Sequence, residues 1–227
     1  MSEPAQPAVA PKKLAHRTPA FDKLARLYCW MEWCTFGPWL QRCRCSFLGE
    51  IGDCRRGIVL GDGDGRFTAQ LLRINPAIEI DAVDASAAML QALKRRAAPH
   101  AARVHAHYAD ARTWQAPDPP CDLIATHFFL DCLTEAEVRA LTQRLHGALS
   151  QSGYWLVSEF AIPEGAFGRW VARPVVWFLY RSFALLTGLT VRSVPDFAAA
   201  LGAAGFTRRG RRSFLRGLLI AELWKKD

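Results

Sequence analysis

The stretch GIVLGDGDGRFTAQLLRI, residues 57–74, decides the fold. A short β-branched run comes first, three alternating glycines follow, and apolar residues at helical spacing close the stretch. This order predicts a buried strand, a tight glycine turn and a helix. Because glycine has no Cβ, residues 61–65 can turn sharply and let the backbone approach a ligand. The stretch is therefore typical of the first strand and helix of a parallel βαβ sheet.

The alternation of strands and helices continues on the C-terminal side of this stretch. Further strands are predicted in AIEIDAVD (77–84), RVHAHYAD (103–110), DLIATHFF (122–129) and YWLVSEF (154–160). Two closing strands, near 206–213 and 217–224, follow a helix that starts at Pro195. We therefore predict an α/β fold with a Rossmann-like, seven-stranded, mostly parallel sheet that has an antiparallel last strand and helices on its flanks.

Residue types also predict where the helices begin and how the chain is divided. Ser86 is the expected cap of one helix, and Thr134 with Glu137 forms a capping box for the next. We predict one domain over 20–227 after a disordered tail at 1–19. Its parts are N-terminal helices (20–50), a core (57–160), a helical insertion that forms a lid (161–192), and the last helix with the terminal strands (193–227).

Composition and charge narrow the class of protein. Hydrophobic residues make up 51% and charged residues 22%, as in globular domains, and no stretch is long and apolar enough for a membrane span. The first residues lack the pattern of a signal peptide, so a cytoplasmic protein is expected. The net charge of +8 is uneven, because 58–160 is acidic and both flanks are basic. Basic flanks suit nucleic acid or an anionic membrane surface, but they also serve as an ordinary solvated surface.

Seven cysteines without a secretory signal predict reduced thiols. Four of them, Cys29, Cys34, Cys43 and Cys45, lie close together in the sequence. Their spacing lacks the paired C-x2-C of zinc sites, so no metal is predicted.

The residues at the ends of the predicted strands indicate the kind of ligand. Arg66 stands where a dinucleotide fingerprint has its third glycine, and the loop lacks a P-loop lysine. Asp62 and Asp64 would repel a pyrophosphate, whereas they suit a cationic amine and a sulfonium. Asp84 ends the second strand and can accept hydrogen bonds from both hydroxyls of a ribose, and Asp110 ends the third strand.

These features resemble the class I S-adenosylmethionine-dependent methyltransferases, in particular the small-molecule group that includes the ubiquinone and menaquinone enzymes. The resemblance covers about 57–225. It rests on VLGDGDGRF, VDASAAML, YADA, DLIATHFFLDCLT and WLVSEF, and the two closing strands resemble the terminal hairpin of the family.

The resemblance implies a role for each matching position. Gly61, Gly63 and Gly65 would pass under the methionine part of S-adenosylmethionine, and Asp84 would bind its ribose. Ala85 and Met89 would also bind the cofactor. Asp110 and Ala111 would lie beside the adenine, and His127 near the methionine end. The family often has an acidic residue where this chain has Val59, so Asp62 becomes the candidate partner of the cofactor's amino group.

Methyl transfer is an in-line displacement that needs positioning and exclusion of water. His127 is the candidate base, with pocket lining as its alternative. Asp131 can orient that histidine or cap the next helix, and we favour the cap. Aromatic residues of the N-terminal helices and the insertion are expected to bind a small apolar acceptor: Tyr28, which is also a candidate catalytic residue, with Trp33, Trp177 and Tyr180. Core packing and contact with a bilayer at Val175–Tyr180 are the alternatives for these aromatic residues.

Two other functions stay open. The C-terminal arginines could serve an RNA or protein methyltransferase, although Thr126-His127-Phe128-Phe129 lacks the Asn/Asp-Pro-Pro-aromatic motif of enzymes that methylate exocyclic amines. We therefore expect no specific nucleic-acid partner. A cofactor-binding module without catalysis is the other alternative.

Overall fold

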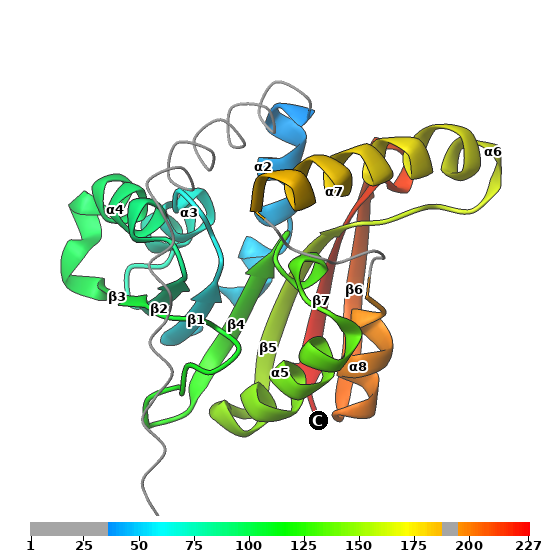
Figure 1. The fold of residues 1–227 in the computed structure, drawn as a ribbon. Helices are drawn as coiled ribbons and strands as arrows, with labels where there is room; N and C mark the ends of the chain where they lie inside the picture. Colours follow the sequence, from blue (N-terminus) through cyan, green and yellow to red (C-terminus); the bar gives the residue numbers. More distant parts are fainter. Residues whose placement is uncertain (1–35, 188–194) are drawn as a thin grey trace, which may run out of the picture.

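In the computed structural model, which describes residues 36–187 and 195–227, the strands form one sheet in the order β3-β2-β1-β4-β5-β7-β6 (Figure 1). The predicted tail at 1–19, and Tyr28 and Trp33, lie outside the described residues. The strands are β1 (Arg56–Leu60), β2 (Glu79–Asp84), β3 (Val104–Tyr108), β4 (Cys121–His127), β5 (Leu149–Phe160), β6 (Phe206–Phe214) and β7 (Leu219–Lys226).

The pairing of the strands confirms the predicted topology. β1 pairs in parallel with β2 and β4, β2 with β3, and β4 with β5. β7 enters between β5 and β6 and runs antiparallel to both. The carboxyl ends of the five parallel strands β1–β5 therefore meet at one edge of the sheet, where open α/β sheets bind ligands.

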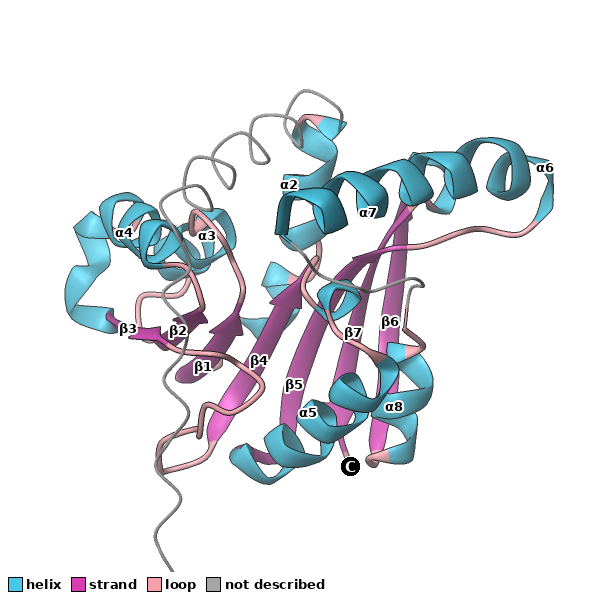
Figure 2. Ribbon diagram, in the orientation of Figure 1, coloured by secondary structure: helices cyan, strands magenta, loops and turns pink. Residues whose placement is uncertain are grey.

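Helices cover both faces of the sheet (Figure 2). Side chains of a strand alternate between the two faces, so Val59 packs toward α3 and α4 while Ile58 and Leu60 pack toward α5 and α8. The helices are α2 (Pro38–Arg44), α3 (Arg66–Ile74), α4 (Ala87–Arg96), α5 (Glu135–Ala148), α6 (Gly165–Phe167), α7 (Arg173–Thr187) and α8 (Phe197–Ala203). Shorter turns are η1 (Leu48–Ile51), η2 (Ala98–Arg103), η3 (Leu130–Cys132), η4 (Gly168–Ala172, a π-helical turn) and η5 (Leu215–Gly217).

The caps of the helices follow the sequence in two places and differ from our expectation in a third. Ser86 caps α4 through the amide of Met89, and Thr134 with Glu137 forms the capping box of α5, as predicted. Asp131 does not cap α5, because it lies in the preceding turn η3 and Thr134 already holds that position.

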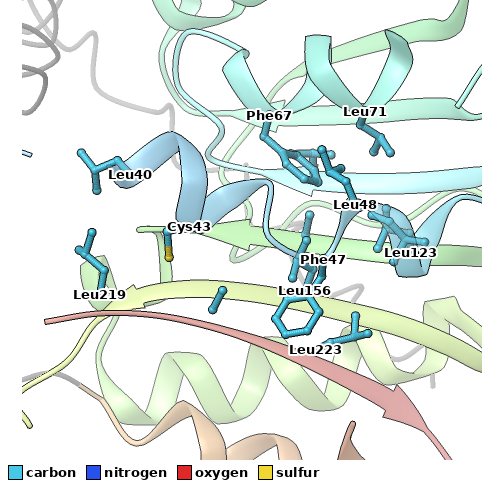
Figure 3. Close-up of a cluster of buried hydrophobic side chains, with 14 of the residues drawn as sticks. Leu40, Cys43, Phe47, Leu48, Phe67, Leu71, Leu123, Leu156, Leu219 and Leu223 are labelled. Atoms are coloured by element: carbon cyan, nitrogen blue, oxygen red, sulfur yellow. The ribbon is translucent and has the colours of Figure 1, made fainter. Parts of the chain in front are cut away.

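Within the range predicted for the N-terminal helices, 20–50, the described helix α2 is short. α2 ends at Arg44, and a turn then directs Phe47 into the core, where the ring lies against Gly210 of β6. A Cβ at Gly210 would lie 2.8 Å from that ring, so the ring can occupy this position because residue 210 is glycine. Figure 3 shows Phe47 among the buried residues of this cluster.

The insertion after β5 is helical, as predicted, and crosses the end of the sheet (Figure 1). α6, η4 and α7 form a nearly continuous helical segment. Its inner face carries Ala172 and Val176, which pack in the same core cluster as Phe36, Leu40 and Phe160. The inner face of the insertion thus belongs to the core of the domain.

Cysteines in the described part behave as small apolar residues. Cys43 is fully buried, and its thiol donates a hydrogen bond to the carbonyl of Ile220 over 3.3 Å. No group of His, Cys, Asp and Glu within 36–187 and 195–227 has the arrangement of a metal site, while Cys29 and Cys34 lie outside these ranges. None of the helices in the same ranges is long and apolar enough to cross a bilayer.

Candidate functional site

The glycine loop between β1 and α3 is held tightly at both ends. Gly61 and Gly65 have φ values of 66° and 80°, which L-residues rarely adopt. A Cβ at Gly61 would lie 2.5 Å from the Phe129 ring, and a Cβ at Gly65 would lie 2.8 Å from the Cα of Leu93 in α4. Both positions therefore require glycine for packing as well as for conformation.

Gly63, at the centre of the loop, is different. Its φ is also positive, at 61°, but the nearest atom to a Cβ built there is the sulfur of Met89 at 4.0 Å. Space in front of Gly63 is therefore open, and this is the point at which the loop backbone can approach a ligand.

Asp62 holds the loop to the helix that follows it. Its carboxylate accepts hydrogen bonds from the amides of Phe67 and Thr68, at 3.3 and 2.8 Å, and from the Thr68 hydroxyl at 2.7 Å. Burial raises the pKa of Asp62, although these hydrogen bonds and the charge of Arg44 lower it in part. Its two oxygens thus serve the start of α3, a role that the sequence analysis missed.

Asp64 does not add its charge to the ligand side of the loop in the way that the sequence suggested. Its carboxylate forms ion pairs with Arg66 at 3.0 Å and with Arg96 of α4 at 2.7 Å. Arg96 also donates to the Asp64 carbonyl. Asp64 therefore ties the loop to α4.

Asp84 lies at the end of β2 and faces the open part of the loop. One of its oxygens accepts a hydrogen bond from the amide of Ser86 at 2.8 Å. Burial raises the pKa of Asp84 to about 6. Hydrogen bonds from the amides of Ser86 and Gly63 lower this pKa in part, whereas the negative charge of Asp62 raises it further. Ala85 is exposed and Met89 is half-buried beside Gly63.

The loop after β3 lies next to Asp84. The amide of Ala109 donates to the Asp84 carbonyl at 3.2 Å. The Arg112 guanidinium donates hydrogen bonds to the Asp110 carboxylate at 2.6 and 3.0 Å, and this pairing lowers the pKa of Asp110. Ala111 is buried in the core on the α5 side. The structure therefore brings Asp84, Ala109 and Asp110 to the same edge of the sheet.

His127, the last residue of β4, is buried, with 2% of its surface exposed. Its Nδ1 lies 3.0 Å from the Ser158 hydroxyl, its ring packs on Phe67 at 4.2 Å, and its Nε2 has no hydrogen-bond partner among the described residues. Burial, with a further contribution from the nearby charge of Arg44, lowers the pKa of His127 well below its usual value. The ring is therefore neutral at neutral pH.

Glu159, near the end of β5, is a site residue that the sequence analysis did not single out. Its Oε1 accepts hydrogen bonds from the amides of Phe129 and Leu130, at 3.1 and 2.8 Å, and it is fully buried. Burial, reinforced by the charge of Asp131, raises the pKa of Glu159 well above its ordinary range. A glutamate inside an apolar strand was the available signal, because a buried carboxyl group needs hydrogen-bond partners.

Three phenylalanines lie together where β4 and β5 end. Phe160 is 5.3 Å from Phe36 and 5.1 Å from Phe128 between ring centroids. Phe128 has a φ of 54°, which is uncommon for a residue with a bulky side chain, and the Arg44 guanidinium lies over its ring at 5.0 Å. This end of the site is thus aromatic, whereas the Asp84 side is polar.

Of the aromatic residues that the sequence suggested for the acceptor, Trp177 is the one whose side chain is described, and it does not join this cluster. The Trp177 side chain is 63% exposed on the outer side of α7, whereas the inner side carries Ala172 and Val176. Tyr180 lies on the same helix, but its side chain is not among those described, and Tyr28 and Trp33 precede the described residues.

Comparison with known proteins finds a family model that matches the part of the chain around this edge of the sheet. Residues 58–153 match the model of a methyltransferase domain. These residues include the glycine loop, Asp84, Asp110 and His127. A search of curated proteins finds no match for this chain.

Solved structures of methyltransferases share the fold. An O-methyltransferase family protein from Burkholderia thailandensis is similar with a TM-score of 0.65 and 18% identity over 91% of this chain and 58% of its own. The mitomycin 7-O-methyltransferase MmcR gives 0.68 and 16% over 91% and 60%. The N-methyltransferase NodS from Bradyrhizobium japonicum, with S-adenosyl-L-homocysteine, gives 0.63 and 13% over 92% and 99%.

The predicted class I methyltransferase fold is confirmed by these matches, and residues 58–153 match the model of a methyltransferase domain. The chain spans about three fifths of the length of the first O-methyltransferases that it matches. The finer resemblance to the ubiquinone and menaquinone enzymes stays a prediction.

Proposed function

We propose that this protein transfers a methyl group from S-adenosylmethionine to a small apolar or aromatic molecule. The observation that carries the proposal is the pairing of an open glycine, Gly63, with the carboxylate of Asp84 at the end of the neighbouring strand. Both lie within the residues that match the methyltransferase domain.

The residues present fit this cofactor. The methionine part of the cofactor can lie close to the backbone of Gly63, because no side chain fills the space in front of this glycine. The Asp84 carboxylate keeps acceptor capacity beyond its hydrogen bond to Ser86 and suits two ribose hydroxyls. Met89 and Ala85 flank that position, and we assign Asp110 and Ala111 to the adenine side. We assign Gly61 and Gly65 to shaping the loop.

Asp62 has a supporting part in this proposal. Its oxygens are engaged with Phe67 and Thr68, so we assign it to fixing the loop. Its negative charge also favours a cationic amino group nearby. This combination would explain why the chain has no acidic residue at Val59.

The cofactor, when bound, supplies an electrophilic methyl group on a sulfonium. The chain's own residues then have to orient the acceptor and exclude water, as an in-line displacement requires. We propose that Glu159 fixes the acceptor side of the site, because it holds the amides of Phe129 and Leu130.

We propose that His127 positions groups instead of removing a proton. Protonation of its ring would place an imidazolium in a buried site close to Arg44, which is unfavourable. A group with so low a pKa is a weak proton acceptor. Tyr28, in the segment that leads into α2, remains our candidate for a catalytic side chain, with Trp33 and Tyr180 as candidates for acceptor contact.

The aromatic cluster of Phe36, Phe128 and Phe160 supports an apolar or aromatic acceptor. Methylation of RNA is supported less well, because three arginines of β6 are already paired within the protein. Arg208 and Arg211 approach Glu222 at 3.0 and 3.5 Å, and Arg212 pairs with Glu50 at 2.6 Å.

Incubation of the protein with methyl-labelled cofactor and a fractionated cell extract tests the proposal. We expect label in small apolar molecules. Label that appears mainly in RNA or protein would overturn the acceptor class, and binding of the cofactor without any transfer would support a non-catalytic binding module.

A further inference from the structure

The outer face of α7 and of the π-helical turn before it exposes large apolar side chains. Trp170, Trp177 and Phe178 are 75%, 63% and 60% exposed, and Val171 is 45% exposed. Single exposed apolar residues are ordinary on a protein surface, but four large ones within residues 170–178 of one helical segment are typical of an interaction site.

The helix itself gathers these side chains on one side. Residues 170, 174, 177, 178 and 181 recur at helical spacing and therefore share a face, which we call the outer face. Ala172 and Val176 lie on the opposite side and are buried against the core. The helix is thus apolar on both sides, and packing against the sheet accounts for only one of them.

Positive charges surround the aromatic side chains. Arg169, Arg173 and Arg181 are exposed on the same segment. Arg216 of η5 is also exposed, and its guanidinium lies 5.7 Å from the Phe167 ring at the start of the insertion. Between Glu164 and Asp196 the sequence contains no acidic residue.

We propose that the outer face of α7 docks on an anionic membrane surface. An interfacial amphipathic helix lies in the plane of the membrane surface. It typically carries tryptophan and phenylalanine on its apolar face and arginines beside them. An anionic lipid surface supplies the negative charge that this segment lacks. The helix would lie in the plane of the headgroups, with Trp170, Trp177 and Phe178 entering the acyl boundary and the arginines at the level of the lipid phosphates.

Cosedimentation of the whole chain with vesicles tests this proposal. We expect binding to vesicles of phosphatidylcholine mixed with phosphatidylglycerol, and much weaker binding to phosphatidylcholine alone. The triple variant Trp170→Ala, Trp177→Ala, Phe178→Ala should lower the partition coefficient on the mixed vesicles at least ~10-fold, because the apolar contact is lost. The double variant Arg169→Gln, Arg173→Gln should lower it by roughly 10- to 30-fold.

The matched control is Arg95→Gln, Arg209→Gln, which removes the same charge at two exposed positions on α4 and β6. This control should keep most of the vesicle binding. If it loses as much as the α7 double variant, only net charge matters and the proposal is wrong. Equal binding of the wild-type protein to neutral and mixed vesicles would also overturn it.

Self-association is the competing explanation of the outer face. Sedimentation velocity of the wild-type protein and the triple variant, without vesicles, distinguishes the two. We expect the same sedimentation coefficient for both proteins, whereas a wild-type dimer that the triple variant abolishes would assign the face to a second copy of the chain. Should the triple variant unfold, Trp170→Ala alone and the arginine variants would still test the proposal.

Vesicle binding needs neither cofactor nor turnover, so a failure to bind vesicles would leave the proposed methyl transfer untouched.

Discussion

The two sides of the candidate site are built in different ways. On the proposed cofactor side, hydrogen bonds and ion pairs within residues 61–96 fix the glycine loop and the side chains of Asp62, Asp64 and Asp84. On the proposed acceptor side, apolar side chains from α2, β5 and the insertion belong to one core cluster although they are far apart in the sequence. Backbone geometry constrains the first side strongly, whereas size and shape of apolar side chains determine the second.

This difference explains why motifs describe one side and not the other. A turn with positive φ at Gly61, Gly63 and Gly65 leaves little choice of residue, so it leaves a readable pattern. An apolar contact such as Phe36 with Phe160 can be made by several residue types. The comparison predicts that substitutions on the cofactor side have larger and more specific effects.

Gly65→Ala should have the largest effect. The new Cβ would lie 2.8 Å from the Leu93 backbone at a φ of 80°, so strain and overpacking add. We expect the free energy of unfolding to fall by about 3 kcal/mol or more in urea titrations. Gly63→Ala is the control, because Gly63 also has a positive φ but a Cβ there meets no clash, and it should lose only about 1 to 2 kcal/mol. Equal losses in the two variants would show that α4 does not clamp the loop.

Asp84→Asn should weaken binding of S-adenosylhomocysteine by roughly 1.5 to 3 kcal/mol, which is the cost of losing hydrogen bonds to a charged group. Equilibrium dialysis at pH 7.5 would measure this change. Asp110→Asn is a useful comparison, because that carboxylate already pairs with Arg112 and should matter less for the ligand. If affinity is unchanged in Asp84→Asn, the ribose assignment is wrong.

The affinity for the same ligand should also depend on pH. Burial raises the pKa of Asp84 from 3.8 to about 6, so the carboxyl group is mostly protonated below that value in the free protein. Ribose hydroxyls favour the ionised form, and affinity should therefore increase as pH rises through 6, by about tenfold between pH 5 and pH 7. Dialysis across this range would measure it. An equally steep dependence in Asp84→Asn would assign the titration to another group.

The smallest effect concerns His127. Because burial lowers its pKa well below the usual value, its ring should stay neutral from pH 6 to pH 8. NMR of the ring carbons should show constant chemical shifts for His127 across this pH range. A midpoint for His127 near 6.5 would restore it as a candidate base.

The sequence predicted the sheet, the glycine turn and the caps Ser86 and Thr134, because these depend on local backbone constraints. It did not predict that Asp62 holds α3 or that Glu159 holds the loop after β4. Those hydrogen bonds depend on which residues the fold brings together, and a pattern of residue types along the sequence does not show this. The prediction for Trp177 rests on aromatic content alone. The burial of Ala172 and Val176, which directs Trp177 outward, depends on tertiary contacts that the sequence pattern does not show.

Calorimetric titration of the wild-type protein with S-adenosylhomocysteine and, separately, with NADH tests the central claim most directly. An open Gly63 beside Asp84, without a third glycine at Arg66, should bind one S-adenosylhomocysteine per chain and no NADH. Binding of NADH in its place, or no heat from S-adenosylhomocysteine at any concentration that dissolves, would contradict the assignment of this edge of the sheet to an S-adenosyl cofactor.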